Sequence, residues 1–192
     1  MPFTQLDLTD RLLLTPRDDE GPARAARLRE LGMGDDQPVP ALDTFARELA
    51  RVTDAPVAAV NFVDERRQYF AGLYDAAVDP ARGPVDPDGG FGRVMPRDLG
   101  YCVHVVARRS ALVLEDVRDF ARFAVNAVVD EAGVASYLGA PLIDPVSGMA
   151  LGTVCVVDQQ PRAWGQQGLH TIKTMAAQLQ REILGGPDRA AG

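Results

Sequence analysis

The segment from residue 135 to residue 157 constrains the fold more than any other part of the chain. Two apolar runs, Ala135–Ile143 and Met149–Val157, flank the five residues Asp144-Pro145-Val146-Ser147-Gly148. Aspartate, proline, serine and glycine favour tight turns, and a turn this short joins antiparallel strands. The chain is therefore expected to contain an antiparallel hairpin, and its apolar strands must be covered by other elements.

A second pair of strands is predicted earlier in the chain. Pro56–Val63 is a nearly unbroken apolar run, typical of a central strand, and Gln68–Leu73 is the expected returning strand after a polar turn. Apolar residues at helical spacing predict helices over Ala23–Leu31, Pro40–Val52 and Trp164–Leu184. Hairpins combined with such helices indicate an α+β sandwich and exclude a doubly wound parallel fold.

The middle of the chain is less regular. Asp75–Arg97 is rich in proline, glycine and aspartate and is predicted to be a long loop, of a kind that often covers a binding site. Periodicity alone leaves Leu99–Ala107 open between helix and strand. Ala111–Glu115 has the character of a short apolar strand, and Val117–Gly133 is expected to be helical but broken by turns.

The balance of charges argues against several classes of partner. The 192 residues carry a net charge of −7, whereas nucleic acids and anionic membranes are bound by clustered lysine and arginine. No apolar stretch approaches the roughly 20 residues that cross a bilayer, and residues 1–20 do not read as a signal peptide. The two cysteines are far apart and suggest no disulfide framework. We therefore expect a cytoplasmic protein that binds neither nucleic acid nor membrane.

Five blocks of sequence resemble one family. They are Gly100-Tyr101-Cys102-Val103-His104, Leu112-Val113-Leu114-Glu115-Asp116, Asp119 through Arg122-Phe123 to Asn126, Tyr137-Leu138-Gly139-Ala140-Pro141-Leu142 and Leu151-Gly152-Thr153-Val154-Cys155-Val156-Val157-Asp158. In this order they are similar to a bacterial stand-alone GAF domain, of the subgroup found with histidine kinases and diguanylate cyclases. One departure is Ala127, where that subgroup usually has proline.

The resemblance implies a GAF/PAS-like sandwich, with a central antiparallel sheet of about six strands and helices on both faces. A helix pair would cover one face, and a ligand pocket would lie on the other, beneath the loop and short helices. It also implies that Leu99–Ala107 is helical and that the function is sensory. We expect a single domain over residues 22–186, between an N-terminal arm (1–21) and a C-terminal tail (187–192). The motif of cyclic-nucleotide-binding GAF domains is absent after the last predicted strand.

The expected ligand is a small polar or amphipathic metabolite in a pocket of roughly a few hundred Å³. Thr153 and Cys155 lie two apart on one predicted strand and must share a face, and Tyr137 and Gly139 do likewise on the neighbouring strand. The predicted pocket residues are Tyr69, Cys102, Asp116, Asn126, Tyr137, Thr153 and Cys155.

Catalysis is not expected. Cys102 and His104 would form a nucleophile and base only if they met, and on a helix residues two apart point in different directions. The GAF-type free methionine sulfoxide reductases offer an enzymatic alternative, but their chemistry depends on clustered cysteines, and Val117–Gly133 contains none. A thiol redox switch made of Cys102 and Cys155 stays open and requires Cα atoms within about 7 Å. No spacing indicates a metal site, and no motif indicates haem or bilin attachment, so no cofactor is expected.

A sensory domain must transmit its signal. We expect no output domain in this chain and therefore a separate signalling protein as partner. The predicted helices Pro40–Val52 and Trp164–Leu184 are expected to pack against their copies in a symmetric homodimer. The alternative to ligand sensing is a ligand-free module for protein interaction or dimerisation.

Overall fold

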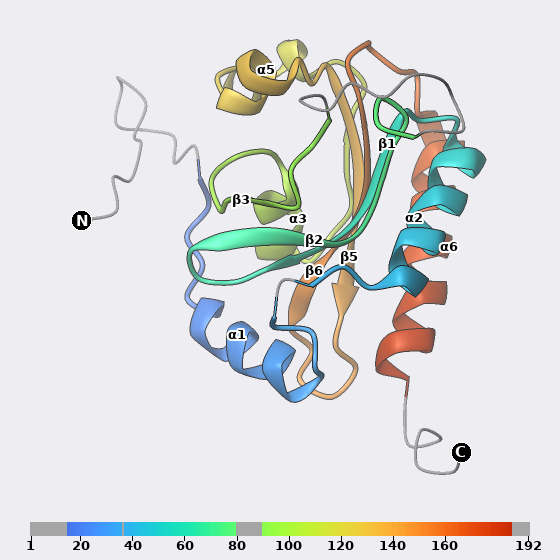
Figure 1. Cartoon of the computed structure of the whole chain (residues 1–192). Coiled ribbons are helices and arrows are strands. Elements are labelled where there is room, and N and C mark those ends of the chain that lie inside the picture. The colour runs from blue at the N-terminus through green and yellow to red at the C-terminus, as the bar shows by residue number, and fades with distance from the viewer. Residues whose placement is uncertain (1–14, 36, 80–89, 186–192) are drawn as a thin grey trace.

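Six antiparallel strands form one sheet at the centre of the molecule (Figure 1). The computed structural model describes residues 15–35, 37–79 and 90–185. The spatial order of the strands is β3-β2-β1-β6-β5-β4. The strands are β1 (Val57–Val63), β2 (Arg67–Asp75), β3 (Val94–Pro96), β4 (Leu112–Leu114), β5 (Ser136–Ile143) and β6 (Ala150–Asp158).

Two hairpins build the middle of this sheet, as the apolar runs predict. β5 pairs with β6 so that Gly139 lies opposite Cys155, and β6 also pairs with β1, which places Ala59 on the other side of Cys155. β1 pairs with β2 through the turn at residues 64–66. Because β1 and β6 have neighbours on both sides, nearly every residue in them is buried.

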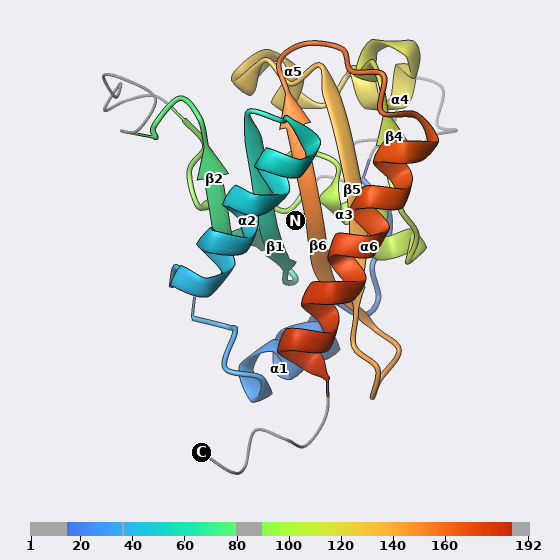
Figure 2. The same ribbon diagram turned by 90° about the vertical axis from the view of Figure 1, so that its right-hand side faces the viewer.

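Two long helices cover one face of the sheet, where they lie side by side (Figure 2). They are α2 (Pro40–Thr53) and α6 (Gly165–Leu184), and each buries an apolar stripe, with Leu49 and Ile172 fully covered. α2 lies very close to β2, because a Cβ atom at Gly72 would lie only 2.3 Å from the carbonyl oxygen of Leu42. Glycine is therefore required at this crossing.

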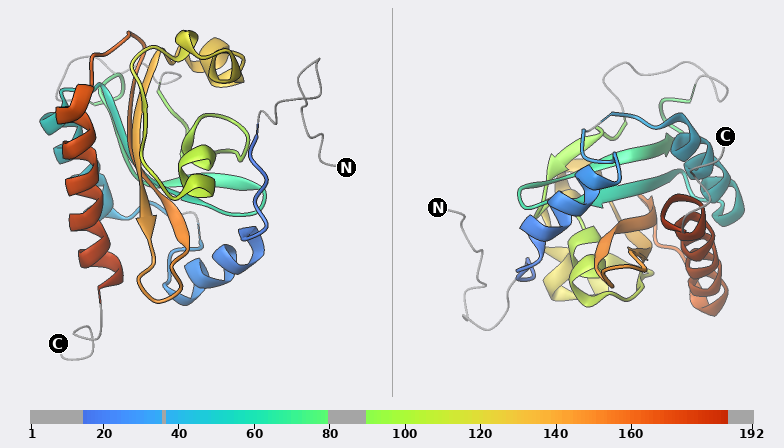
Figure 3. Two further views of the ribbon diagram at one scale, coloured as in Figure 1. Left: turned by 180° about the vertical axis from the view of Figure 1, so that it is seen from behind. Right: turned by 90° about the horizontal axis from the view of Figure 1, so that it is seen from below.

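Shorter helices lie on the opposite side of the sheet from α2 and α6 (Figure 3). They are α1 (Gly21–Glu30), α3 (Cys102–Arg108), the 3₁₀ turn η2 (Val117–Asp119), α4 (Ala121–Ala124) and α5 (Ala127–Ala132). The structure thus confirms an α+β sandwich with a six-stranded antiparallel sheet and helices on both faces. None of the described helices combines the length and the apolar character that a membrane span needs.

Two details differ from, or complete, the sequence-based expectations. Val94–Pro96 falls in the segment predicted to be loop but forms the edge strand β3, because its backbone pairs with β2 over only three residues, too few for a recognisable pattern. Residues 80–89 of the same predicted loop lie outside the described residues. Leu99–Ala107 contains a helix, α3, and not a strand, as the family resemblance implied.

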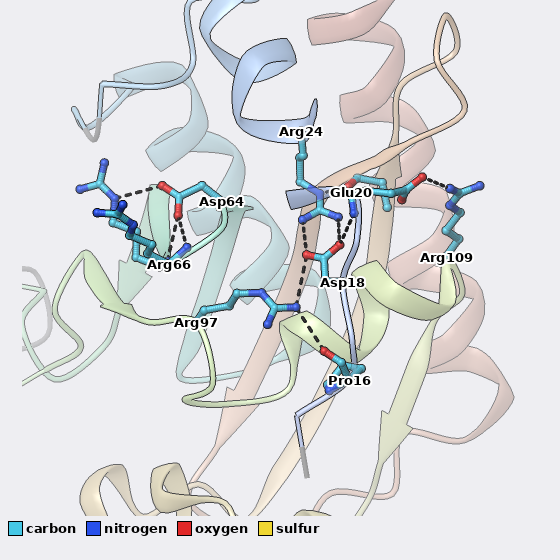
Figure 4. Close-up of polar contacts among 10 residues, drawn as sticks. Pro16, Asp18, Glu20, Arg24, Asp64, Arg66, Arg97 and Arg109 are labelled. Atoms are coloured by element: carbon cyan, nitrogen blue, oxygen red, sulfur yellow. Dashed lines mark hydrogen bonds and ion pairs between the residues drawn. The ribbon is translucent and has the colours of Figure 1, made fainter. Parts of the chain in front are cut away.

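The segment before α1 is held against the domain by ion pairs (Figure 4). The carboxylate of Asp18 accepts two hydrogen bonds from the guanidinium of Arg24, at 2.7 and 2.8 Å, and lies 3.2 Å from that of Arg97. Arg97 also donates to the carbonyl of Pro16, and Arg109 pairs with Glu20. Arg24 is fully buried, and its Nε donates to the carbonyl of Ala150 in β6 at 2.7 Å. The described part of the predicted arm is therefore fastened to the sheet.

Candidate functional site

An apolar cavity lies between the sheet and the helices α3 and α5. Its volume is about 40 Å³, which admits a molecule of a few non-hydrogen atoms, since a single water needs roughly 10–15 Å³. No aspartate, glutamate, histidine, lysine or arginine is present among the described residues of its wall. The wall consists of Val57, Ala59, Gln68, Phe70, Leu73, Phe91, Met95, Leu99, Gly100, Tyr101, Cys102, Val128, Val134, Tyr137, Cys155 and Val157.

Two thiols and a phenol meet in this wall. The Sγ atoms of Cys102 and Cys155 lie 3.7 Å apart, although the residues are 53 positions apart in sequence. The hydroxyl of Tyr137 lies 3.5 Å from Cys102 Sγ and donates to it. Each of the three side chains is buried, and neither cysteine is in a disulfide.

The strands position Cys155 and Tyr137 by simple alternation. Cys155 and Thr153 share the face of β6 that is turned toward α3, whereas Val154 and Val156 pack toward α2 and α6. Gly139 lies opposite Cys155, and a Cβ atom there would lie 2.2 Å from the hydroxyl oxygen of Tyr137. The missing side chain at Gly139 therefore leaves the space in which the Tyr137 hydroxyl reaches the thiols.

Two side-chain amides fix the rim of the cavity, residues 96–100. Asn126 accepts a hydrogen bond from the backbone of Gly100 at 2.9 Å and donates to the carbonyls of Gly100 and Asp98. Gln68 donates to the carbonyls of Pro96 and Leu99, and its oxygen accepts from Asn61. Gly100 has a φ of +89°, which glycine adopts readily, and Cys102 begins α3 two residues later.

The environment makes the two thiols chemically unequal. The hydrogen bond between the two thiols lowers the pKa of Cys102, with further help from Thr153, Tyr137 and Asn61, and this outweighs burial, which alone would raise it. The same hydrogen bond and burial raise the pKa of Cys155. Burial also raises the pKa of Tyr137, so its hydroxyl keeps its proton. Of the two thiols, Cys102 is therefore the more acidic.

His104 takes no part in this cluster. Its ring packs edge-on against Phe123, with ring centroids 5.1 Å apart, and the side chain is buried. Burial lowers the pKa of His104 to about 4, helped by the charges of Arg122, Arg108 and Arg97, so the imidazole is neutral at pH 7. Within the described ranges, no three His, Cys, Asp or Glu side chains gather as metal ligands.

The predicted pocket residues divide into two groups. Cys102, Tyr137 and Cys155 line the cavity, and Thr153 is fully buried next to the two thiols. The hydroxyl of Thr153 has no hydrogen-bond partner among the groups that the structure describes. It therefore remains available to the thiolate of Cys102, whose pKa it helps to lower.

The other three predicted residues do not line this cavity. Tyr69 packs on the opposite face of the sheet, against Phe62, with the core beneath α2 and α6. Asp116 caps η2 and pairs with Arg118 outside the cavity. Asn126 caps α5 and fixes the rim without lining the cavity. The sequence of β2 does not show which face Tyr69 occupies, because both faces of that strand are apolar, and Asp116 and Asn126 are helix-capping residues.

Sequence reasoning missed most of the wall, which is apolar. Val57 and Ala59 lie on the same face of β1, and Ala59 is the direct partner of Cys155. The alternation of β1 relative to Cys155 would have identified both. A larger, more polar hollow of about 360 Å³ adjoins the cavity, because Val57, Phe91, Val134 and Val157 line both. The cavity and the hollow are therefore neighbours that share part of their walls.

The comparisons with known proteins agree with this architecture. The family model of the GAF domain matches residues 37–183. The cyclic di-GMP phosphodiesterase PA2567 of Pseudomonas aeruginosa is 26% identical over 151 residues, which cover 77% of this chain but only 23% of that protein. The chain therefore spans about a quarter of the length of this curated relative.

Solved structures share the fold at low sequence identity. The GAF domain of a phosphoenolpyruvate-protein phosphotransferase from Acinetobacter has a TM-score of 0.54 at 18% identity, covering 87% of this chain and 94% of that one. The free methionine-R-sulfoxide reductase of Neisseria meningitidis has a TM-score of 0.57 at 13% identity, covering 88% and 93%. Together with the match of the family model over most of its length, the antiparallel sheet and its two helical layers show that this chain belongs to the GAF domain family.

Proposed function

We propose that this GAF domain is a non-catalytic sensory domain that binds a small, predominantly apolar molecule in the cavity beside Cys102 and Cys155. The observation that carries the proposal is the cavity wall, which is apolar apart from Gln68, Tyr101, Tyr137 and the thiols. Apolar walls with few polar groups are typical of sites for small ligands. The volume of about 40 Å³ favours a ligand smaller and less polar than the metabolite expected from the sequence.

The same wall argues against a reductase of free methionine sulfoxide. An amino acid carries an ammonium and a carboxylate group, and burying such charges without a partner is costly. The described cavity residues include no charged side chain that would pair with either group. The likeness to the Neisseria enzyme, at 13% identity, is a likeness of fold. We therefore propose that the chain is not an enzyme.

The rim of the cavity supplies a way to transmit ligand binding. Leu99 and Gly100 line the cavity, and the adjacent Arg97 holds the segment before α1 through Pro16 and Asp18. A ligand that shifts residues 97–100 would change how this segment is held, and a partner protein would detect the altered surface. The two free thiols are typical of a reducing compartment, which supports a cytoplasmic location.

The homodimer remains part of the proposal. α2 and α6 lie side by side on the face away from the cavity, so contact between copies there would leave the cavity open (Figure 2). Val52, at the end of α2, is 44% exposed and would be covered in such a contact. Size-exclusion chromatography coupled to light scattering should give the molar mass of a dimer for the wild type and of a monomer for a Val52→Glu variant.

Xenon is a suitable probe of the cavity, since it occupies small apolar cavities in proteins. We expect NMR signals of residues in the cavity wall, such as Ala59 and Val128, to shift under xenon pressure and to saturate. Short-chain alcohols and other apolar compounds of a few non-hydrogen atoms would then be screened by thermal shift, and at least one should raise the melting temperature of the full chain.

The matched variants are Ala59→Leu, which fills the cavity, and Ala177→Leu, the same change on the exposed side of α6. Ala59→Leu should abolish both responses, and Ala177→Leu should preserve them. If the wild type responds to neither xenon nor any compound, the proposal fails and the ligand-free interaction module replaces it. Equal responses in wild type and Ala59→Leu would place binding outside this cavity.

A further inference from the structure

The paired thiols are a feature that reversible ligand binding does not use. Cys102 at the start of α3 and Cys155 in the middle of β6 are each at most 5% exposed, yet both border the cavity. A structural cysteine in an apolar core packs as a small hydrophobe and needs no sulfur partner. Here the thiols face each other, with the hydroxyls of Tyr137 and Thr153 beside them.

The geometry permits a disulfide after a small movement. The sulfur atoms lie 3.7 Å apart, and a disulfide bond is about 2.05 Å long, so they must approach by roughly 1.7 Å. The cavity borders both side chains and gives them room to rotate. Cys102 is also the first residue of its helix, where backbone adjustment costs less than in the middle of a strand.

Access restricts which oxidant reaches the pair. A large disulfide such as oxidised glutathione does not fit a cavity of about 40 Å³. A hydroperoxide with few non-hydrogen atoms is of the right size, and a larger hollow that shares Phe91 and Val157 with the cavity lies next to it.

We propose that Cys102 and Cys155 form a peroxide-reactive dithiol site, in which a small hydroperoxide converts the facing thiols into an intramolecular disulfide. The thiolate of Cys102 attacks one peroxide oxygen, so an S–O bond forms and the O–O bond breaks. The leaving oxygen takes up the proton that Cys102 released and departs as water or an alcohol. Cys102 is then a sulfenic acid.

The thiol of Cys155 completes the reaction. Its sulfur attacks the sulfur of the sulfenic acid, the S–S bond forms, the S–O bond breaks, and water leaves with the proton of Cys155. In sum, two thiols and one hydroperoxide give one disulfide, one alcohol or water, and one further water, with two electrons passing from sulfur to oxygen. The reaction is stoichiometric and would be reversed by a dithiol reductant.

The surrounding groups assign the two roles. The lowered pKa of Cys102 makes it the attacking sulfur, and the raised pKa of Cys155 keeps it protonated until the sulfenic acid forms. The donor hydroxyl of Tyr137 stabilises the Cys102 thiolate at 3.5 Å. The disulfide would tie α3 to the central strand β6 and draw both sulfurs away from the cavity. It would thereby change the cavity that the proposed function assigns to the ligand. The inference rests on that function in one respect only, which is that a small hydroperoxide must be able to reach the cavity.

The test uses the full chain, reduced and then exposed to hydrogen peroxide, to tert-butyl hydroperoxide or to oxidised glutathione. Intact mass and thiol counting should show the loss of two hydrogens and two thiols with hydrogen peroxide, and peptide mapping should show a Cys102–Cys155 disulfide. Oxidised glutathione should react at least about tenfold more slowly than hydrogen peroxide, because it must wait for local opening. Equal rates for the two oxidants, or peroxide oxidation without the disulfide, would overturn the proposal.

Variants separate the roles of the residues. Cys155→Ser, or Cys155→Ala if the first is unstable, should accumulate a sulfenic acid at Cys102 that dimedone traps. Cys102→Ser should give no such adduct at Cys155. Tyr137→Phe should slow oxidation severalfold, whereas Tyr74→Phe, a buried tyrosine on the other face of the sheet, should not. Dimedone trapping at Cys155 instead of Cys102 would refute the assignment.

The outcome is separable from that of the proposed function. A disulfide that forms with peroxide in a chain that responds to neither xenon nor any apolar compound would refute the ligand-binding function. It would leave this inference standing, because the inference requires only that peroxide reach the two thiols. A response to xenon without the disulfide would do the reverse.

Discussion

Replacing Asp18 by alanine should destabilise the folded chain by roughly 3 kcal/mol, because it leaves a buried guanidinium without its counter-ion. The side chains of Arg24 and Asp18 are 0% and 5% exposed. Removing one partner of a buried ion pair costs roughly 3–5 kcal/mol, and the low end applies because Arg24 keeps its hydrogen bond to the carbonyl of Ala150. Urea unfolding followed by circular dichroism measures this free energy directly.

The same pair predicts a dependence on pH. Burial raises the pKa of Asp18, but the hydrogen bond and charge of Arg24, with the charge of Arg97, outweigh it, so the folded-state pKa is lowered. The stabilisation is therefore complete above the unfolded pKa of about 3.9 and is lost as the pH falls through the lower folded value. Asp18→Ala should lack this part of the acid sensitivity.

Glu48 offers the matched control. It accepts two hydrogen bonds from Arg51, at 2.6 and 2.8 Å, as Asp18 does from Arg24, but both side chains are largely exposed. Solvent screens such pairs, and Glu48→Ala should leave the unfolding midpoint unchanged. If Asp18→Ala loses less than about 1 kcal/mol, or no more than Glu48→Ala, the reasoning from burial is refuted.

Three further predictions concern the cavity and its surroundings. Gly139→Ala should lower the free energy of unfolding by roughly 1–3 kcal/mol, because the added methyl group overpacks against the Tyr137 hydroxyl. Adding Tyr137→Phe should recover part of that loss, as measured by urea unfolding. If the double variant recovers nothing, the contact between residue 139 and the hydroxyl is contradicted. Asn126→Ala should cost about 2 kcal/mol and speed hydrogen exchange at the Gly100 amide, whereas unchanged exchange would show that the rim does not depend on Asn126. The pKa of His104 is about 4 in the folded chain and about 6.5 in the unfolded chain. The unfolded chain therefore binds a proton first as the pH falls, so the contribution of His104 to the free energy of unfolding is complete above pH 6.5 and is lost as the pH falls toward 4. Stability should thus drop by roughly 2 kcal/mol from pH 7 to pH 5, and a His104→Leu variant that shows the same drop would rule this residue out.

Regular patterns in the sequence predict the layers of the fold well. The hairpin of residues 135–157 and the helix beginning at Pro40 follow from turn residues and apolar spacing, which are local properties. The shared face of Thr153 and Cys155 follows from strand alternation, and both side chains do lie beside Cys102. Once one residue of a strand is known to face the cavity, the alternation of the strand identifies the other residues that face it.

The remaining parts of the site depend on contacts between distant residues. A bulge in β2 beside the pair Val60 and Asn61 shifts its alternation, so Phe70 and Leu73 both face the cavity while Tyr69 faces away. No local pattern reveals such a bulge when both faces of a strand are apolar. The contact between Cys102 and Cys155 joins residues 53 positions apart, and only the packing of α3 on β6 creates it.

The hydrogen bonds and ion pairs that hold residues 16–24 against the domain affect the choice of boundaries for expressed fragments of this protein. A fragment trimmed to the family match at residues 37–183 would lack Asp18, Arg24 and Leu28, the last of which is part of the apolar core. It would leave the carbonyl of Ala150 without the hydrogen bond that Arg24 donates, and Arg97 without its carboxylate partner. Expression fragments, domain swaps and fusion junctions should therefore begin upstream of Pro16.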